Sequence, residues 1–208
     1  MARYRGPACR ICRREGLKLF FKGSRCFSDK CSVERRAYAP GDAGQKKGKL
    51  SQYGVQLREK QKVRKLFGLL EAQFQNQFKV ASKSKGITGE YLLQLLERRL
   101  DSICYKLGFA ASRADARQII RHRHIAVNDK TITIPSYNLN EGDVIQVREK
   151  SKTFDRIKFG QETLKYRELP TWLELDAENL KGTLKTLPTR EDITLPVEEH
   201  LITELYSR

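Results

Sequence analysis

Long apolar runs are missing from this chain of 208 residues. No stretch approaches the roughly 18 apolar residues that a membrane-spanning helix requires. The amino-terminal segment MARYRGPACR also lacks the apolar run of a signal peptide. We therefore expect a cytoplasmic protein that has no membrane partner and is not exported.

Catalytic motifs are missing as well. The chain has three histidines, His122, His124 and His200, and none lies in a sequence context typical of nucleophilic catalysis. It has no glycine-rich phosphate loop of the P-loop or dinucleotide type, and no H-x-E beside a P-C-x-x-C. The sequence predicts a protein that is not an enzyme, with no catalytic residues and no small-molecule substrate.

Acidic residues are scarce relative to basic ones, since 25 Asp and Glu face 41 Lys and Arg, a net charge of +16. Residues 1–50 carry 14 Lys and Arg against 4 Asp and Glu, whereas residues 151–208 carry 9 against 11. This imbalance indicates a polyanionic partner, with nucleic acid first and a membrane surface as the weaker alternative. The 39% of hydrophobic residues is enough for at least one core.

Cysteine is rare but concentrated, because four of the five, Cys9, Cys12, Cys26 and Cys31, lie in the first 31 residues. The pairs C-x2-C and C-x4-C can close around one tetrahedral metal ion. One structural Zn²⁺ is the first expectation, an iron–sulfur cluster is less favoured, and unligated thiols are the plain alternative. A disulfide framework fits poorly, since the number of cysteines is odd and no export signal is present. Cys104 lies on an apolar helix face, so we expect a buried structural thiol there.

Hydrophobic periodicity predicts three helices. Apolar residues at steps of three and four indicate one helix over 55–80. A second should follow Thr88 and stop at Gly108. Ser112 is a credible N-cap for a third, over 113–123.

Short strands follow these helices. The turn dipeptide Asn128-Asp129 lies between two alternating segments, which indicates a hairpin over 125–134. Another strand is expected at 144–147. The remaining sequence contains candidate strands near 172–175 and 180–184 and an amphipathic helix over 197–205.

One row of cations lies on the third predicted helix. Arg113, Arg117 and Arg121 are four residues apart, so they form a ridge on one face, and His122 and Arg123 follow directly. Such a ridge can straddle phosphates, because arginine offers bidentate geometry. The alternative is a solvated helix face, which is what most charge runs are.

A second group of cations lies around the cysteines. The metal would act as a staple that holds these arginines in a fixed shape against RNA. The group comprises Arg3, Arg5, Arg10, Arg13 and Arg14.

Five segments together resemble one known family. They are MARYRGPACRICRREG, LSQYGVQLREKQKVRKLFG, GFAASRADARQIIRHRHIAVNDK, PTWLELD and EEHLITELYSR. In order and spacing they are similar, from end to end, to the bacterial family of small-subunit ribosomal protein S4.

The resemblance implies an α+β fold. A mostly helical amino-terminal domain would carry the small four-cysteine module, and an inserted S4-type RNA-binding domain would pack a helix-turn-helix on a small, mainly antiparallel sheet. We expect a basic cysteine module at 1–45, a helical part at 46–95, the RNA-binding domain at 96–160, and a carboxyl-terminal segment at 161–208 that packs back on the first domain.

The resemblance also implies a function. The chain would be a primary binder of the 5′ domain of 16S-type rRNA, a nucleator of subunit assembly and a ribosomal constituent in the cytoplasm. Its RNA face would be the Arg113-to-Arg123 group described above, and members that keep the cysteines bind zinc. Protein S5 would be a neighbour that shares in translational accuracy. A basic loop would meet mRNA at the entrance of its channel, through Lys46, Lys47 and Lys49, a cluster that is weak evidence by itself.

One departure and two alternatives remain. The family turn usually reads Asn-Gly, so Asn128-Asp129 leaves the turn type open, at a local cost below about 1 kcal/mol.

The same RNA-binding unit also occurs in RNA-modifying enzymes and in stand-alone RNA chaperones. Too few residues flank the unit for a modifying domain, and the cysteine module and PTWLELD argue against a chaperone.

Overall fold

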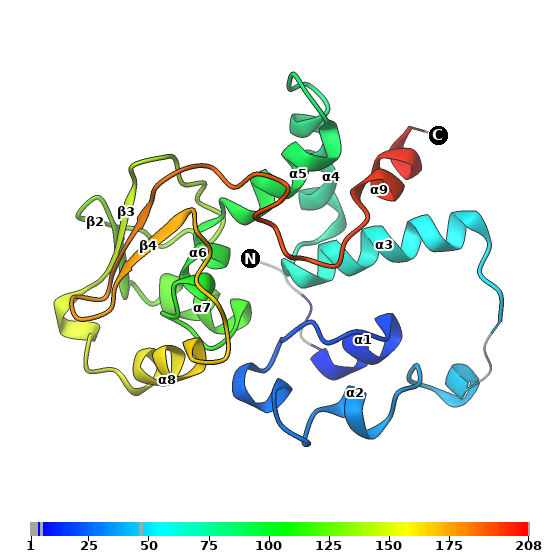
Figure 1. Ribbon diagram of the computed structural model, residues 1–208, viewed down its shortest axis with the longest axis horizontal. Helices are drawn as coiled ribbons and strands as arrows, with labels where there is room; N and C mark the ends of the chain where they lie inside the picture. The colour runs from blue at the N-terminus through cyan, green and yellow to red at the C-terminus, as the bar shows by residue number, and fades with distance from the viewer. Residues whose placement is uncertain (1–3, 5, 46–47, 208) are drawn as a thin grey trace. The chain divides into compact units, whose positions relative to one another are not determined.

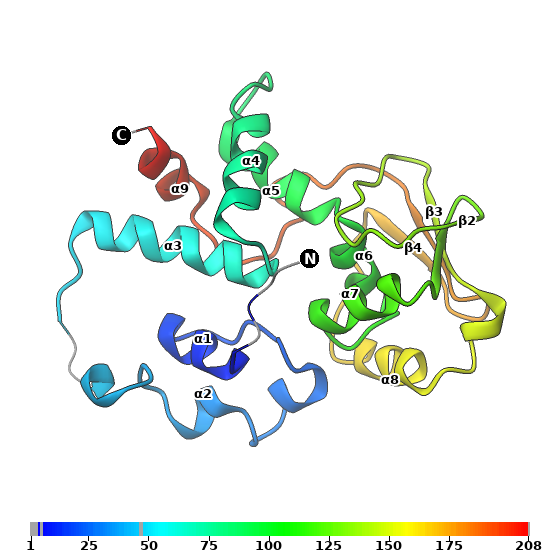
Figure 2. The same ribbon diagram turned by 180° about the vertical axis from the view of Figure 1, so that it is seen from behind.

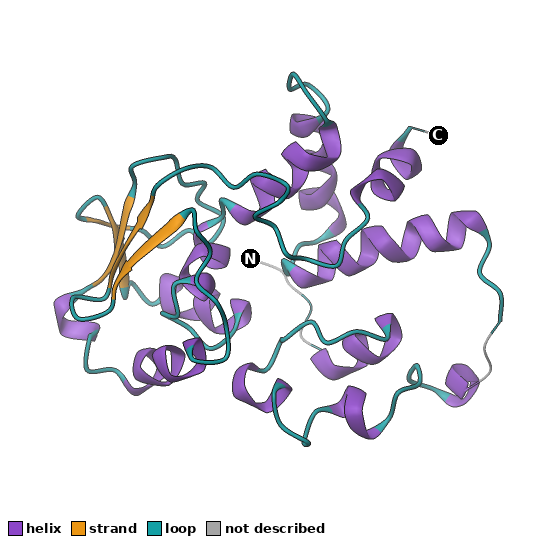
Figure 3. Ribbon diagram, in the orientation of Figure 1, coloured by secondary structure: helices purple, strands orange, loops and turns teal. Residues whose placement is uncertain are grey.

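The computed structural model describes residues 4, 6–45 and 48–207 (Figure 1). The chain divides into two compact units, and the division falls inside one helix. Unit 1 contains residues 1–93 and 195–208, and unit 2 contains residues 94–194. Unit 1 is helical and unit 2 combines helices with an antiparallel sheet (Figure 3), so the expected α+β class is confirmed.

Unit 1 is built from helices and short helical turns. In chain order these are α1 (Ala8–Glu15), η1 (Gly23–Cys26), α2 (Ser32–Arg35), η2 (Asp42–Gln45), α3 (Gln52–Leu66), α4 (Glu71–Ala81), the first part of α5 (Thr88–Glu97) and α9 (Glu199–Tyr206).

The carboxyl-terminal helix α9 packs on α3 and α4. Figures 1 and 2 both show α9 beside α3. Phe78 of α4 stacks on Tyr206, with ring centroids 4.3 Å apart. The Gln56 side-chain amide of α3 donates a hydrogen bond of 2.7 Å to Glu204. The amphipathic helix expected at the end of the chain is therefore confirmed.

The single helix expected over 55–80 is wrong, because α3 and α4 are separate. Gly68 adopts φ 64°, in the left-handed region that glycine tolerates best. The Leu69 N–H then bonds to the Arg64 carbonyl at 2.9 Å, which closes the end of α3. The apolar periodicity runs on because both helices supply the core, with Val63 and Phe74 fully buried.

Unit 2 packs its helices beside one antiparallel sheet of strand order β2-β1-β3-β5-β4. Its core includes Ile103, Phe109, Ile119, Ile145, Trp172 and Leu184. The strands are β1 (Ile125–Val127), β2 (Lys130–Thr131), β3 (Val144–Val147), β4 (Leu173–Asp176) and β5 (Lys181–Leu184). The other elements are α6 (Leu100–Lys106), α7 (Arg113–Arg121), η3 (Glu149–Ser151) and α8 (Asp155–Leu164).

The helix expected from Thr88 to Gly108 is also divided. Helix α5 ends before Arg99, whose backbone is extended and pairs with Asn138 in an isolated bridge. The Leu100 N–H then bonds to the Tyr137 carbonyl at 2.8 Å. A loop distant in sequence thus interrupts the helix, and only the predicted stop at Gly108, with φ 78°, agrees with the structure.

The hairpin and its turn are well defined. Asn128 and Asp129 have φ 46° and 66°, the two positive values of a type I′ turn. The Asn128 carboxamide oxygen accepts from the Val144 N–H, and Asp129 accepts from the Gln146 side chain at 2.7 Å. These bonds compensate for the strain of a non-glycine residue, so the turn type left open by the sequence is settled.

The carboxyl-terminal segment differs from expectation. Strands β4 and β5 belong to the sheet of unit 2, because β5 pairs with β3. Only residues 195–208 join unit 1, so the expectation that all of 161–208 packs on the first domain is wrong for residues 161–194. Helix α8 was not foreseen.

Cys104 is fully buried, as predicted, and burial raises the pKa of its thiol far above the ordinary range.

Gly160 of α8 touches the backbone that follows α6. A Cβ at this position would lie 2.6 Å from the Gly108 carbonyl oxygen and 2.8 Å from the Ala110 nitrogen. Gly160→Ala should therefore lower the free energy of unfolding by about 1–3 kcal/mol, although alanine favours helices. Denaturant unfolding measures this, with Gly54→Ala in α3 as the control, since the nearest neighbours of its Cβ would be side-chain atoms, the Ser51 hydroxyl at 3.3 Å and Leu50 at 3.7 Å. Equal stability of the two variants would contradict the close approach.

Candidate nucleic-acid interface and cysteine cluster

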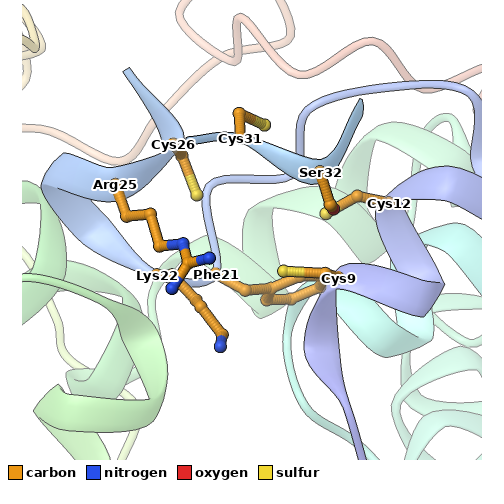
Figure 4. Close-up of a pocket in the computed structure, with 8 residues that line it drawn as sticks. All are labelled: Cys9, Cys12, Phe21, Lys22, Arg25, Cys26, Cys31 and Ser32. Atoms are coloured by element: carbon orange, nitrogen blue, oxygen red, sulfur yellow. The ribbon is translucent and has the colours of Figure 1, made fainter. Parts of the chain in front are cut away.

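The four amino-terminal cysteines line one small cavity. Cys9 and Cys12 come from one face of α1, whereas Cys26 ends η1 and Cys31 caps α2. The cavity is about 10 Å³, room for roughly one atom the size of a water oxygen. Figure 4 shows the four sulfurs around a common space. The structure thus brings together the residues that the spacing predicted.

Local backbone geometry produces this convergence. Gly16 ends α1 with φ 68°, and the Leu17 N–H bonds to the Cys12 carbonyl at 3.2 Å. The chain then turns back, and Gly23, with φ 57°, starts the η1 turn that carries Cys26.

The thiols are suited to a cation but lie in an open arrangement. Burial, with smaller contributions from the three neighbouring cysteines, raises the pKa of Cys12 to about 11. Burial also raises the pKa of Cys26. Both thiols therefore stay protonated at neutral pH unless a positive ion stabilises the thiolates. Within the described residues, no three His, Cys, Asp or Glu side chains stand close enough to hold a metal as they are placed.

Helix α1 has a second, basic face. Arg10 and Arg14 are exposed and one turn apart. Arg13 is half-buried, donates from Nε to the Tyr38 carbonyl at 3.0 Å and lies over the Tyr38 ring. Two of the predicted cations are thus available to a partner, and the third also braces the fold. Arg3 and Arg5 lie outside the described residues.

The arginine ridge of α7 does not face solvent as a unit. Arg117 is 6% exposed, and its Nη1 donates to Asp101 Oδ2 at 2.8 Å. Arg99 binds both oxygens of the same carboxylate, at 3.1 and 2.9 Å. The interpretation of Arg117 as a phosphate contact is therefore corrected, because a buried ion pair holds its guanidinium.

Arg113 belongs to a neighbouring buried group. Its Nη2 lies 3.7 Å from Glu97, a fully buried carboxylate that also accepts from Ser102 Oγ at 2.7 Å. Burial alone would raise the pKa of Glu97, but Lys106 and Arg113 hold it below its ordinary value. Of the ridge, only Arg121 is exposed.

The basic surface available to a polyanion lies at the end of α7. Arg121, His122 and Arg123 are exposed, and the Arg123 carbonyl accepts from Arg148 Nη1 at 3.1 Å. Sequence reasoning missed Arg148, which follows directly after β3. Only the pairing of β3 with β1 brings it close to Arg123. We call these four residues the α7 basic end.

The loop cations are only partly described. Lys49 is exposed, and Lys46 and Lys47 lie outside the described residues. No helix in the described part of the chain combines the length and the apolar composition needed to span a membrane.

Comparison with known proteins matches this architecture. Residues 3–97 match the Ribosomal protein S4/S9 N-terminal domain, and residues 98–145 match the S4 domain. The chain is 57% identical over 208 residues to the small ribosomal subunit protein uS4 of Caldicellulosiruptor saccharolyticus, and 55% identical to that of Citrifermentans bemidjiense, covering 100% of each chain. This chain belongs to the uS4 family.

Membership of the uS4 family tests several of the expectations drawn from the sequence. The uS4 family consists of structural ribosomal proteins, so the expectations of a non-enzyme and of a ribosomal location are confirmed. The boundary between the two matched domains, at residues 97 and 98, falls at the end of α5. It is next to Glu97, the buried carboxylate of the ion-pair group.

Substitution of two arginines of α7 should affect the stability of this uS4 protein very differently. Arg117→Ala leaves Asp101 short of a buried partner, so the free energy of unfolding should fall by about 3 kcal/mol. Arg121→Ala, one turn away and exposed, should change it by less than about 0.5 kcal/mol. Urea unfolding of both variants tests this contrast. A harmless Arg117→Ala would mean that the Arg117–Asp101 pair contributes nothing beyond the pairing of Asp101 with Arg99.

Proposed function

We propose that this chain binds small-subunit rRNA as a structural constituent of the ribosome, chiefly through the α7 basic end. The single observation that carries the proposal is the separation of cations within unit 2. Arg113 and Arg117 face buried carboxylates, whereas Arg121 and Arg123 are exposed and no carboxylate pairs with them among the described residues. Exposed guanidinium groups of this kind suit RNA phosphates.

Finer roles rest on the family resemblance. The chain would be a primary binder of the 5′ domain of 16S-type rRNA and would nucleate assembly. Lys49, with Lys46 and Lys47, would meet mRNA at the entrance of its channel, and protein S5 would be a neighbour that shares in accuracy. The exposed position of Lys49 is compatible with the mRNA contact.

The cysteine cluster would hold one structural Zn²⁺. The donor set supports this, since four thiols surround a cavity of about 10 Å³ and zinc prefers thiolate sulfur. When bound, the ion would link α1 to the η1–α2 segment and supply no catalysis. That link would keep Arg10 and Arg14 at a fixed place beside RNA. An iron–sulfur cluster is the less favoured occupant.

Binding of small-subunit rRNA should depend steeply on salt. If about six phosphates are contacted, affinity should fall by roughly 10³-fold or more between 50 and 200 mM monovalent salt. Arg121→Ala should reduce the slope of log K against log salt by about one. Filter binding measures both. Arg190, a half-buried arginine whose Nη1 donates to the Ile193 carbonyl three residues away, provides the control variant Arg190→Ala. A flat salt dependence of the wild type would contradict the proposal.

About one zinc per chain should be found by elemental analysis. Cys9→Ser and Cys26→Ser should each lose it and should lower the thermal stability of unit 1, because binding free energy is folding free energy in such modules. Cys104→Ala, at a buried thiol outside the cluster, should keep the metal. Absorbance near 400 nm would favour an iron–sulfur cluster, and the finding of neither zinc nor iron would refute the site.

A further inference from the structure

Beside the α7 basic end lies an open hollow of about 240 Å³. It is lined by Gln118, Ile119, His122, His124, Phe154 and Arg156. These residues come from α7, the segment that follows it, and the start of α8, which lie close together in both ribbon views (Figures 1 and 2). The hollow is smaller than the roughly 300 Å³ at which sites for drug-sized ligands begin, so it suits one ring system.

Aromatic rings form one side of the hollow. His124 and Phe154 are stacked with centroids 5.0 Å apart and planes 17° from parallel. His122 continues the series at 6.3 Å and 12° from His124. Phe154 is 40% exposed, so much of this apolar side chain remains uncovered. Ile157, three residues later, is fully buried in the core. Three nearly parallel rings offer a stacking surface for another flat ring.

The central ring is held in place. Its Nδ1 lies 2.9 Å from Ser151 Oγ, a buried hydroxyl. Burial, with smaller contributions from His122 and Arg148, lowers the pKa of His124, so the ring is neutral at neutral pH. A fixed, uncharged central ring keeps the series in place, so that stacking of a base on the series costs little side-chain freedom.

Cations surround the rings. Arg156 lines the hollow and is half-exposed while 3.7 Å from Asp115 on α7, which leaves part of its guanidinium for a ligand. Arg121 and Arg123 of the α7 basic end are exposed and adjoin the lining residue His122 in the sequence. Gln118 contributes a half-buried amide, which can both donate to and accept from a base edge.

We propose that this hollow receives one unpaired RNA base, stacked at an open end of the series of His122, His124 and Phe154 rings, while Arg156 and the α7 basic end meet the neighbouring phosphates. Unpaired RNA is recognised by such combinations of stacked aromatic rings and cations. The proposal rests on the proposed rRNA binding and adds the kind of nucleotide bound and the residues that stack on it.

The test uses the full chain and two single-stranded RNA decamers. One carries 2-aminopurine at its centre, and the other has an abasic site at that position. The wild type should bind the first about tenfold more tightly and should quench its fluorescence, since one stacked base contributes that order of affinity. Phe154→Leu and His122→Ala should remove most of the preference and the quenching.

The matched control is Phe159→Leu, in helix α8, of which Phe154 is the N-cap residue. Phe159 is 45% exposed and outside the lining set, so this variant should keep the wild-type preference. Phe154→Leu should leave the salt slope of rRNA binding unchanged, because it removes no phosphate contact, whereas Arg156→Gln should lower it by about one. Thermal melting checks that each variant is folded.

Equal binding of the two decamers by the wild type, binding of neither, or identical behaviour of Phe154→Leu and Phe159→Leu would overturn the base pocket. If rRNA is still bound with a steep salt dependence in that case, the proposed function stands without the pocket. Loss of rRNA binding by the wild type itself would instead overturn the proposed function.

Discussion

The buried carboxylates of Glu97 and Asp101 are the constraint on which the rest of unit 2 depends. Each is at most 2% exposed, and a buried charge is tolerated only when paired. They therefore draw Arg99, Lys106 and two arginines of α7 into the interior, and this tethers α5, α6 and α7 to one another. Of the three ridge arginines of α7, Arg121 at the end of the helix is the one left exposed, so that end is available to a polyanion.

Unit 1 is under a different constraint: its amino-terminal segment is strongly basic and has few apolar residues with which to form a core. Aromatic contacts and the helix pair α3–α9 build a core behind it. The four cysteines contribute a second, separate centre, in which burial, with smaller contributions from neighbouring cysteines, raises the pKa of Cys12 and Cys26. A cation bound at that centre would favour the thiolates over the protonated thiols.

Several features could be predicted because their causes are local. The Ser112 cap forms as expected, with the Asp115 N–H donating to its hydroxyl at 3.2 Å. The hairpin forms because Asn and Asp tolerate positive φ. The break between α5 and α6 could not be predicted because its cause is distant in sequence: Arg99 leaves the helix to pair with Asn138. The break between α3 and α4 at Gly68 is local, but the apolar periodicity continues through it. Periodicity alone records burial and does not register such a break.

The amino-acid sequence by itself determined the basic balance, the cysteine spacing, the absence of catalytic motifs and the family, since each is a property of residue types and their order. Only the tertiary structure decided which arginine of the ridge meets solvent. Arg113, Arg117 and Arg121 are equivalent in spacing, but Asp101 lies 16 residues before Arg117 and faces it only after α6 and α7 have packed. Ion pairing depends on distance in space, and that distance exists only in the folded chain.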